Sequence, residues 1–256
     1  MTQPWFFATN SLTLSDPEYS GMILAMLASQ RINAPYLVPY MIYDGESDPF
    51  CDALHESGVQ IIHHEFSMIE EIKKNPKWSD PVFQRIARGT YLRLDIPILS
   101  EMLNLNTAEV LYTDIDVLFL KQPQPRGLTF EPFAVGPEFD PQDFINMNAG
   151  VMYINIPKMA ETRQAFMEYI KTHHLTAFTF DQDSLRRFYT GQWGHLPIEY
   201  NWKPYWGVNP DACIVHFHGP KPSMRATDFA EPQIGDMKVG GYDYYCGVYD
   251  TYLGMF

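Results

Sequence analysis

Residues 108–120 form an apolar run that carries two carboxylates, Asp114 and Asp116, in its middle. An ionised carboxylate that leaves water is costly unless it is paired or bound to a metal, and no Lys or Arg follows until Lys121. In extended backbone, residues i and i+2 face the same side, about 7 Å apart. The run therefore predicts a buried strand whose end directs both carboxylates to one hard cation. The alternative is a strand-end turn with solvated Asp side chains.

The composition predicts one globular domain and argues against several classes of partner. The chain has 256 residues, of which 46% are hydrophobic, and no Gly/Ser-rich linker divides it, so we expect a single domain over residues 1–256. The net charge of −13 argues against nucleic acid and against an anionic membrane surface, because both need clustered Lys and Arg.

The chain also lacks the sequence signals of a membrane or secreted protein. No apolar run reaches the roughly 20 residues of a transmembrane helix, and the first residues do not resemble a secretion signal. Cys51, Cys213 and Cys246 are widely spaced and odd in number, which is typical of free thiols in a reducing compartment. We therefore expect a cytoplasmic protein.

Apolar, β-rich runs alternate with helix-compatible segments. The tripeptide Ser-Asp-Pro begins at Ser15, Ser47 and Ser79, and each copy should cap a helix and place Pro in its first turn. The third copy opens a long predicted helix from Pro81 to Leu103. The alternation predicts an α/β fold with a mostly parallel central sheet flanked by helices. Strands are expected at residues 5–9, 36–43, 59–63, 110–113, 133–135, 150–156 and 213–218, and later helices at 157–171 and 182–189.

The segment from His216 to Pro222 combines two imidazoles, a glycine and Lys221. In open α/β sheets ligands bind at the carboxyl ends of strands, where Asp116 and His216 would both lie. Two carboxylates and one imidazole would suit Mn²⁺ better than an all-oxygen Mg²⁺ site, although Mg²⁺ is an alternative. Two structural histidines before a Gly-Pro turn are the other interpretation.

Several short motifs follow one another along the chain. They are Phe6-Phe7-Ala8-Thr9-Asn10, Gly89-Thr90-Tyr91-Leu92-Arg93-Leu94, Leu111-Tyr112-Thr113-Asp114-Ile115-Asp116, Asn146-Met147-Asn148-Ala149-Gly150-Val151, Asp181-Gln182-Asp183-Ser184-Leu185, Tyr200-Asn201-Trp202 and the loop from His216 to Pro222.

In this order and spacing the chain resembles the retaining glycosyltransferases of family 8, the group of glycogenin and the bacterial lipopolysaccharide galactosyl- and glucosyltransferases, which have the GT-A fold. The resemblance covers about residues 5–222, and the ordered set is far more specific than any one motif. Residues 223–256 lie outside it and form a C-terminal tail of unknown role.

The resemblance implies a nucleotide-diphosphate sugar donor, with UDP-glucose or UDP-galactose expected, a divalent cation and a glycan or glycolipid acceptor. It implies that the sugar keeps its anomeric configuration. Asp114, Asp116 and His216 would be the metal ligands. The implied donor-binding residues are Ala8 and Asn10 at the uridine, Arg93, Asp114 and Ile115, Gly219 and Lys221 at the diphosphate, and Asn148, Ala149, Asp181 and Gln182 beside the transferred sugar.

The reaction needs stabilisation of negative charge on the departing diphosphate, which a divalent ion and Lys221 could supply. We expect Gln182 and Asp181 to be the catalytic residues. A neutral Gln182 is a poor nucleophile, whereas Asp181 and Asp183 could act as a nucleophile, accept sugar hydroxyls or cap a helix. The family suggests attack on the face from which the diphosphate leaves, and the residues themselves leave a covalent intermediate open.

The chain departs from the family pattern at two places. Asn10 stands where the family often has an acidic residue in its first motif. The final loop is one residue shorter than usual and has Ser223 in place of a Trp, which bears on the phosphate role of Lys221. His218 lies where the family varies and is given no metal role.

Two other functions are alternatives. A sugar-phosphate nucleotidyltransferase would be expected to have a Gly-rich basic loop after the first strand, whereas residues 8–14 read Ala-Thr-Asn-Ser-Leu-Thr-Leu. A glycan- or nucleotide-binding module without turnover is the second alternative, and the intact Asp114, Asp116 and His216 argue against it.

Overall fold

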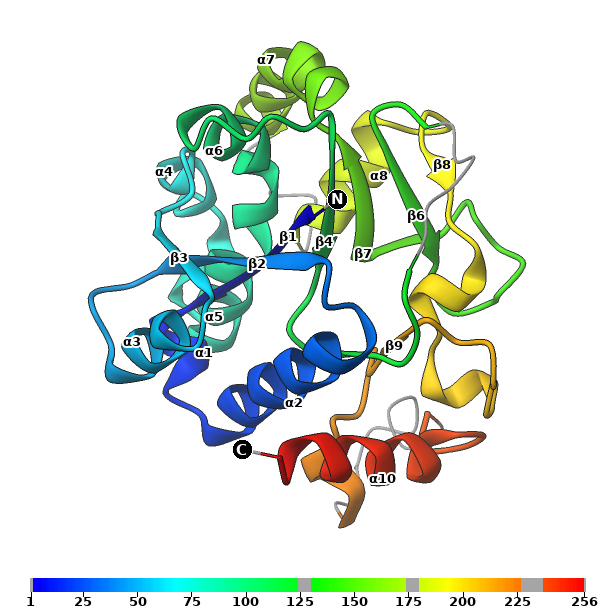
Figure 1. Cartoon of the computed structure of the whole chain (residues 1–256). Helices are drawn as coiled ribbons and strands as arrows, with labels where there is room; N and C mark the ends of the chain where they lie inside the picture. Colours follow the sequence, from blue (N-terminus) through cyan, green and yellow to red (C-terminus); the bar gives the residue numbers. More distant parts are fainter. Residues whose placement is uncertain (1, 124–129, 174–179, 227–236, 256) are drawn as a thin grey trace.

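A computed structural model describes residues 2–123, 130–173, 180–226 and 237–255 (Figure 1). Its central sheet has the strand order β3-β2-β1-β4-β7-β6-β8, and β5 and β9 form a separate pair. The strands are β1 Gln3–Asn10, β2 Leu37–Asp44, β3 Gln60–His63, β4 Glu109–Thr113, β5 Val117–Phe119, β6 Phe133–Pro137, β7 Met147–Asn155, β8 Gly194–His195 and β9 Ile214–His216.

Helices connect and cover these strands. The α-helices are α1 Ser11–Leu14, α2 Pro17–Asn33, α3 Pro49–Glu56, α4 Ile69–Ile72, α5 Pro81–Thr90, α6 Ile96–Met102, α7 Ile156–His173, α8 Asp181–Phe188 and α10 Tyr242–Leu253. The short 3₁₀ helices are η1 Pro76–Ser79, η2 Tyr91–Asp95, η3 Ile198–Asn201, η4 Pro204–Trp206 and η5 Pro222–Ala226.

The predicted α/β fold with a mostly parallel central sheet is confirmed. Strands β3, β2, β1 and β4 pair in parallel, and β6 pairs in parallel with β8. Strand β7 runs antiparallel to both of its neighbours, β4 and β6. The carboxyl ends of β1, β2 and β4 therefore meet at one edge of the sheet, where a ligand site is expected.

Side chains of β1 alternate between two cores, one on each face of the sheet. Trp5 and Phe7 pack with residues of α2 and α3, whereas Phe6 and Ala8 pack with residues of α5, α6, α7 and α8. This alternation is the period-two pattern of a strand that is buried on both faces. It gives a layer of helices on each side of the sheet.

The three Ser-Asp-Pro tripeptides start helices in the way that the sequence predicts. Asp16, Asp48 and Asp80 are the N-cap residues of α2, α3 and α5, and each carboxylate accepts a hydrogen bond from the backbone N–H two residues later. The following Pro occupies the first turn, where its missing N–H costs nothing.

The single long helix predicted from Pro81 to Leu103 is wrong. The stretch breaks into α5, η2 and α6, and Pro97 lies in the first turn of α6. Proline within a continuous helix would lose a hydrogen bond and clash with the carbonyl four residues earlier, here that of Arg93. The break creates the buried turn η2, which carries Arg93 and Asp95 into the interior.

The C-terminal helix α10 lies beside α2 (Figure 1). Tyr242, Tyr245 and Cys246 pack in one cluster with Met22 and Ala25 of α2. The described part of the tail beyond residue 223 thus packs on the fold. Among the described residues, no helix combines the length and the apolar character that crossing a membrane requires.

The cap of α3 gives a stability prediction. Replacing Asp48 by Ala removes the acceptor for the Phe50 N–H, 2.8 Å away, and should lower the free energy of unfolding by about 1 kcal/mol. Urea denaturation measures this change. Asp48→Asn keeps a capping oxygen and is the matched control. Equal stability of Asp48→Ala and the wild type would contradict the role of the cap.

Candidate functional site

Asp114 and Asp116 lie in the junction between β4 and β5, and His216 ends β9. Val117 of β5 pairs with His216, and the backbone N–H of Asp114 donates to the carbonyl of Gly150 on β7 at 2.7 Å. One ligand atom from each of Asp114, Asp116 and His216 lies within 4.8 Å of the others. The structure thus brings together the three residues that the sequence predicted as metal ligands.

The chemistry of this group fits a divalent cation. The Oδ1 atom of Asp116 is buried, has no hydrogen-bond partner among the described residues, and lies 3.3 Å from Nε2 of His216. The Nδ1 atom of His216 faces the side-chain oxygen of Asn201 at 3.0 Å, which leaves Nε2 toward the carboxylates. Two carboxylates and an imidazole form a donor set that suits Mn²⁺.

Positive charge surrounds this acidic pair. Lys221 Nζ donates to Oδ2 of Asp116 and, at 2.8 Å, to the carbonyl of Phe217. Burial opposes ionisation of Asp116, but the positive charge of Lys221 counters it, and the pKa of this carboxyl lies well below its usual range. Asp116 is therefore a carboxylate at neutral pH.

Arg93 crosses the site from η2. Its Nη2 donates to Oδ1 of Asp114 at 2.8 Å, its Nη1 donates to the carbonyl of Ala149, and its Nε lies 3.0 Å from Oδ2 of Asp181. Its guanidinium also lies 4.5 Å from the centre of the Tyr112 ring. Burial raises the pKa of Asp181 to about 6, because desolvation and Asp114 together outweigh the attraction of Arg93.

Two cavities that are open to solvent adjoin the Asp114 and Asp116 carboxylates. The first is lined by residues of β1, α2, α5, the β4–β5 junction and the loop before η5, among them Ala8, Tyr19, Arg85, Ile115 and Lys221. The second is lined by Arg93, Glu138, Asn148, Asp181, Gln182, His216 and His218, among others. Asp114, Asp116 and Lys221 line both.

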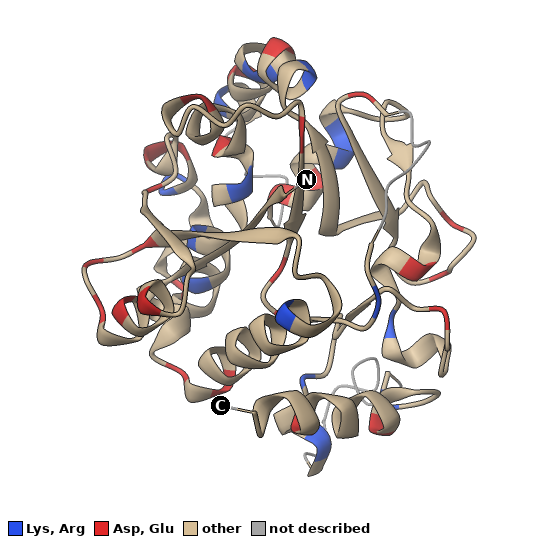
Figure 2. Cartoon of the chain, in the orientation of Figure 1, with Lys and Arg blue, Asp and Glu red and all other residues tan. Residues whose placement is uncertain are grey.

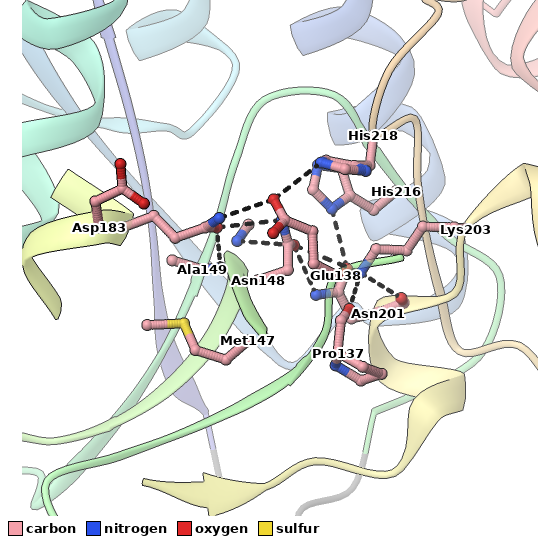
Figure 3. Close-up of polar contacts among 12 residues, drawn as sticks. Pro137, Glu138, Met147, Asn148, Ala149, Asp183, Asn201, Lys203, His216 and His218 are labelled. Carbon is pink, nitrogen blue, oxygen red and sulfur yellow. Dashed lines mark hydrogen bonds and ion pairs between the residues drawn. The ribbon is translucent and has the colours of Figure 1, made fainter. Parts of the chain in front are cut away.

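Gln182 and Glu138 form the polar wall of the second cavity. Gln182 Oε1 accepts from the backbone N–H of Ala149 at 2.8 Å, and its Nε2 donates to Oε1 of Glu138 at 2.9 Å. Arg186 Nη2 donates to the other oxygen of Glu138. Nε2 of His218 lies 3.5 Å from Oε1 of Glu138 (Figure 3). Gln182 is thus held by partners at both ends of its amide.

Three residues predicted at the donor site do not line either cavity. The side chain of Asn10 is fully buried: it caps α1 through the Thr13 N–H and donates to the carbonyl of Arg85 at 2.8 Å. Ala149 contributes its backbone groups to Gln182 and Arg93. Gly219 has a φ of +98°, a conformation that favours glycine, and lies in the turn before Lys221.

Two residues that the structure places in this region, Glu138 and Lys203, are missing from the predictions made from the sequence. Glu138 follows β6 in a loop, and Lys203 lies between η3 and η4 with its side chain fully buried. Burial lowers the pKa of Lys203 well below its ordinary range, although Glu138 opposes this shift. Neither residue belongs to a recognisable motif. For Lys203, the sequence offers one indication of burial: it is a Lys among apolar and turn residues in the run Asn201-Trp202-Lys203-Pro204.

Cationic side chains line the two cavities although the chain as a whole is acidic. In Figure 2 the Lys and Arg positions lie scattered among Asp and Glu positions, and no described helix is basic along its length. The chain has 18 Lys and Arg against 31 Asp and Glu. The local cations Arg85, Arg93 and Lys221 at the cavities therefore contrast with the charge of the whole chain.

The ionisation of Glu138 predicts a pH effect on stability. Burial opposes ionisation, but hydrogen bonds from His218 and Arg186 lower its pKa from 4.5 to about 2. The unfolded chain then takes up a proton near pH 4.5, whereas the folded chain does so near pH 2, so this contribution to stability is lost as the pH falls between these values. Glu138→Gln should therefore show a shallower loss of unfolding free energy over this range.

Urea denaturation at pH 6, 4 and 3 measures the difference between the wild type and Glu138→Gln. The exposed Glu101, replaced by Gln, is the matched control and should leave the pH profile unchanged. Parallel profiles for the wild type and Glu138→Gln would contradict the assignment.

No protein-family model and no curated protein matches the chain. Its fold does match solved structures. The glycosyltransferase GlyE of Streptococcus pneumoniae TIGR4 matches with a TM-score of 0.63 and 16% identity over 100% of this chain, which spans only 64% of the GlyE chain.

The galactosyltransferase LgtC, in complex with donor and acceptor sugar analogs, matches with a TM-score of 0.71 and 17% identity over 99% of this chain and 96% of its own. Mouse xyloside xylosyltransferase 1 matches with a TM-score of 0.56 and 13% identity over 84% of this chain and 96% of its own. The chain has the GT-A fold of glycosyltransferases.

Proposed function

We propose that the protein is a metal-dependent glycosyltransferase that moves a hexose from a nucleotide-diphosphate sugar, UDP-glucose or UDP-galactose, to a glycan or glycolipid acceptor with retention of configuration. The observation that carries this proposal is the convergence of Asp114, Asp116 and His216 where two cavities meet in a GT-A fold. Residues 1–256 would form one such domain. The unpaired thiols of Cys51, Cys213 and Cys246 suit the reducing cytoplasm.

The donor would occupy the first cavity with its nucleoside and reach the second with its sugar. Ala8 and Ile115 line the first cavity, and Asn10 would act there by shaping the turn after β1. Lys221, presented by the turn at Gly219, would meet the diphosphate. Asn148, Asp181 and Gln182 line the second cavity, with the Ala149 backbone behind them, and would surround the hexose.

Asp114, Asp116 and His216 would hold the divalent cation, Mn²⁺ or alternatively Mg²⁺. When bound, this ion supplies a Lewis acid for the negative charge that grows on the departing diphosphate. Arg93 orients Asp114 through a hydrogen bond, and Lys221 adds a positive charge at the leaving group. Asp181 is engaged by Arg93, so attack from the face that the diphosphate leaves fits these contacts better than a covalent intermediate.

Calorimetry of UDP with and without Mn²⁺ tests the donor site. Asp116→Asn should weaken Mn²⁺-dependent UDP binding by about 10-fold or more, because it removes one of two anionic ligands, and should leave the circular dichroism spectrum unchanged. The exposed Asp211, replaced by Asn, is the matched control. Unchanged UDP affinity in Asp116→Asn would contradict the metal assignment.

A panel of nucleotide sugars, left to hydrolyse with the wild type and Mn²⁺, would identify the sugar that is released. Absence of UDP and nucleotide-sugar binding with any divalent metal would overturn the proposed function.

Gln182→Ala tests the reacting centre. Because Gln182 lies beside Asn148 and Glu138 in the second cavity, its loss should lower kcat by more than it lowers the affinity for the donor. Steady-state kinetics and calorimetry with the same donor measure the two effects. The exposed Gln142, replaced by Ala, is the control. Equal losses would assign Gln182 to general donor binding.

A further inference from the structure

A directional chain of hydrogen bonds runs behind the candidate metal ligands, and Lys203 lies at its origin (Figure 3). Lys203 Nζ donates to the carbonyls of Pro137 and Asn201 at 2.9 and 3.0 Å, and it lies 3.5 Å from Oδ1 of Asn148. Its side chain is 0% exposed. A lysine buried to this extent needs such acceptors, and the carbonyls can only accept.

Two backbone donors fix the direction of the chain. The N–H of Gly150 donates to Oδ1 of Asn148 at 3.2 Å, and the N–H of Ala149 donates to Oε1 of Gln182 at 2.8 Å. A backbone N–H cannot accept, so the atoms facing these donors are the amide oxygens. The amide nitrogen of Asn148 then points to Gln182, and that of Gln182 points to Glu138.

The same oxygen of Asn148 also orients Asn201. The amide nitrogen of Asn201 donates to it at 2.9 Å, which turns the amide oxygen of Asn201 toward Nδ1 of His216 at 3.0 Å. Both ring nitrogens of His216 face oxygens that can only accept, but Nδ1 is hydrogen-bonded to Asn201, whereas the 3.3 Å contact of Nε2 with Oδ1 of Asp116 is not a hydrogen bond. A neutral His216 ring that keeps the bond to Asn201 carries its proton on Nδ1 and presents the lone pair of Nε2 to Asp116.

Close packing holds the ring and the amide in these positions. A Cβ atom on Gly150 would lie 2.1 Å from Cε1 of His216, and one on Gly136 would lie 3.0 Å from Cβ of Asn201. The two glycines of β7 and β6 therefore make room for His216 and Asn201 against the sheet.

We propose that Asn201 is a positioning residue that holds neutral His216 in the Nδ1–H tautomer, with its own orientation set by Asn148, so that Nε2 is ready for a divalent cation before the cation arrives. The binding of a cation at this position rests on the proposed function, whereas the tautomer of the metal-free His216 ring does not depend on it. Hydrogen bonds to the second nitrogen of a metal-binding imidazole fix its tautomer and strengthen binding in this way.

Nitrogen-15 NMR of the metal-free protein at pH 8, with histidine labelled on both ring nitrogens, reads the tautomer directly. The His216 signals are assigned by their loss in His216→Gln. The wild type should show a protonated Nδ1 and an unprotonated Nε2. Asn201→Leu should lose this preference, whereas Asn201→Asp, which keeps an acceptor for Nδ1–H, should retain it.

Electron paramagnetic resonance titration with MnCl₂ gives the second readout. Asn201→Leu should bind Mn²⁺ about 10- to 100-fold more weakly than the wild type, and Asn201→Asp should remain within a few-fold of it. A wild type with the proton on Nε2, or an Asn201→Leu variant with unchanged tautomer and Mn²⁺ affinity, would overturn the proposal.

The wild-type tautomer decides the proposal even if Asn201→Leu fails to fold. The nitrogen-15 readout also separates this proposal from the proposed function. Failure of the wild type to bind Mn²⁺ and nucleotide sugars would overturn the proposed function, while the tautomer would still test the role of Asn201.

Discussion

The buried guanidinium of Arg93 is the interaction on which the arrangement of the site depends. It contacts the Asp114 carboxylate, the Ala149 carbonyl and the Asp181 side chain, which come from three different parts of the chain. Burial disfavours its charge, but Asp114 and Asp181 raise the pKa of Arg93 above its ordinary value. Removal of this cation would leave the buried Asp181 carboxylate without its cationic partner, an outcome that costs far more than the loss of an exposed ion pair.

The balance of charge is therefore local. A chain with a net charge of −13 repels anions at long range, yet Lys221 and Arg85 line the cavity proposed for a nucleotide diphosphate. The cations that line the cavity, together with a bound metal ion, would have to overcome this repulsion of an anionic ligand. Salt screens the repulsion, which therefore weakens with distance. The ion pair between Lys221 and Asp116 keeps a positive group beside the ligand set.

Local patterns predicted much of the fold and only part of the site. The capping role of Asp48 depends on neighbouring residues alone, and Asp114 and Asp116 stand out because carboxylates are rare in apolar runs. The helix predicted from Pro81 to Leu103 is interrupted, and predicting this interruption required giving Pro97 more weight than the otherwise helical pattern around it. Glu138 and Lys203 escaped prediction because they act through contacts between distant loops, and no local spacing records such contacts.

The two cavities share a wall that includes Asp114, Asp116 and Lys221, so the binding of a ligand in one cavity affects binding in the other. A molecule in the first cavity becomes part of the boundary of the second and changes its shape and its electric field. The two cavities thus form one compartment. The affinity of each cavity for its ligand depends on the molecule that occupies the other cavity.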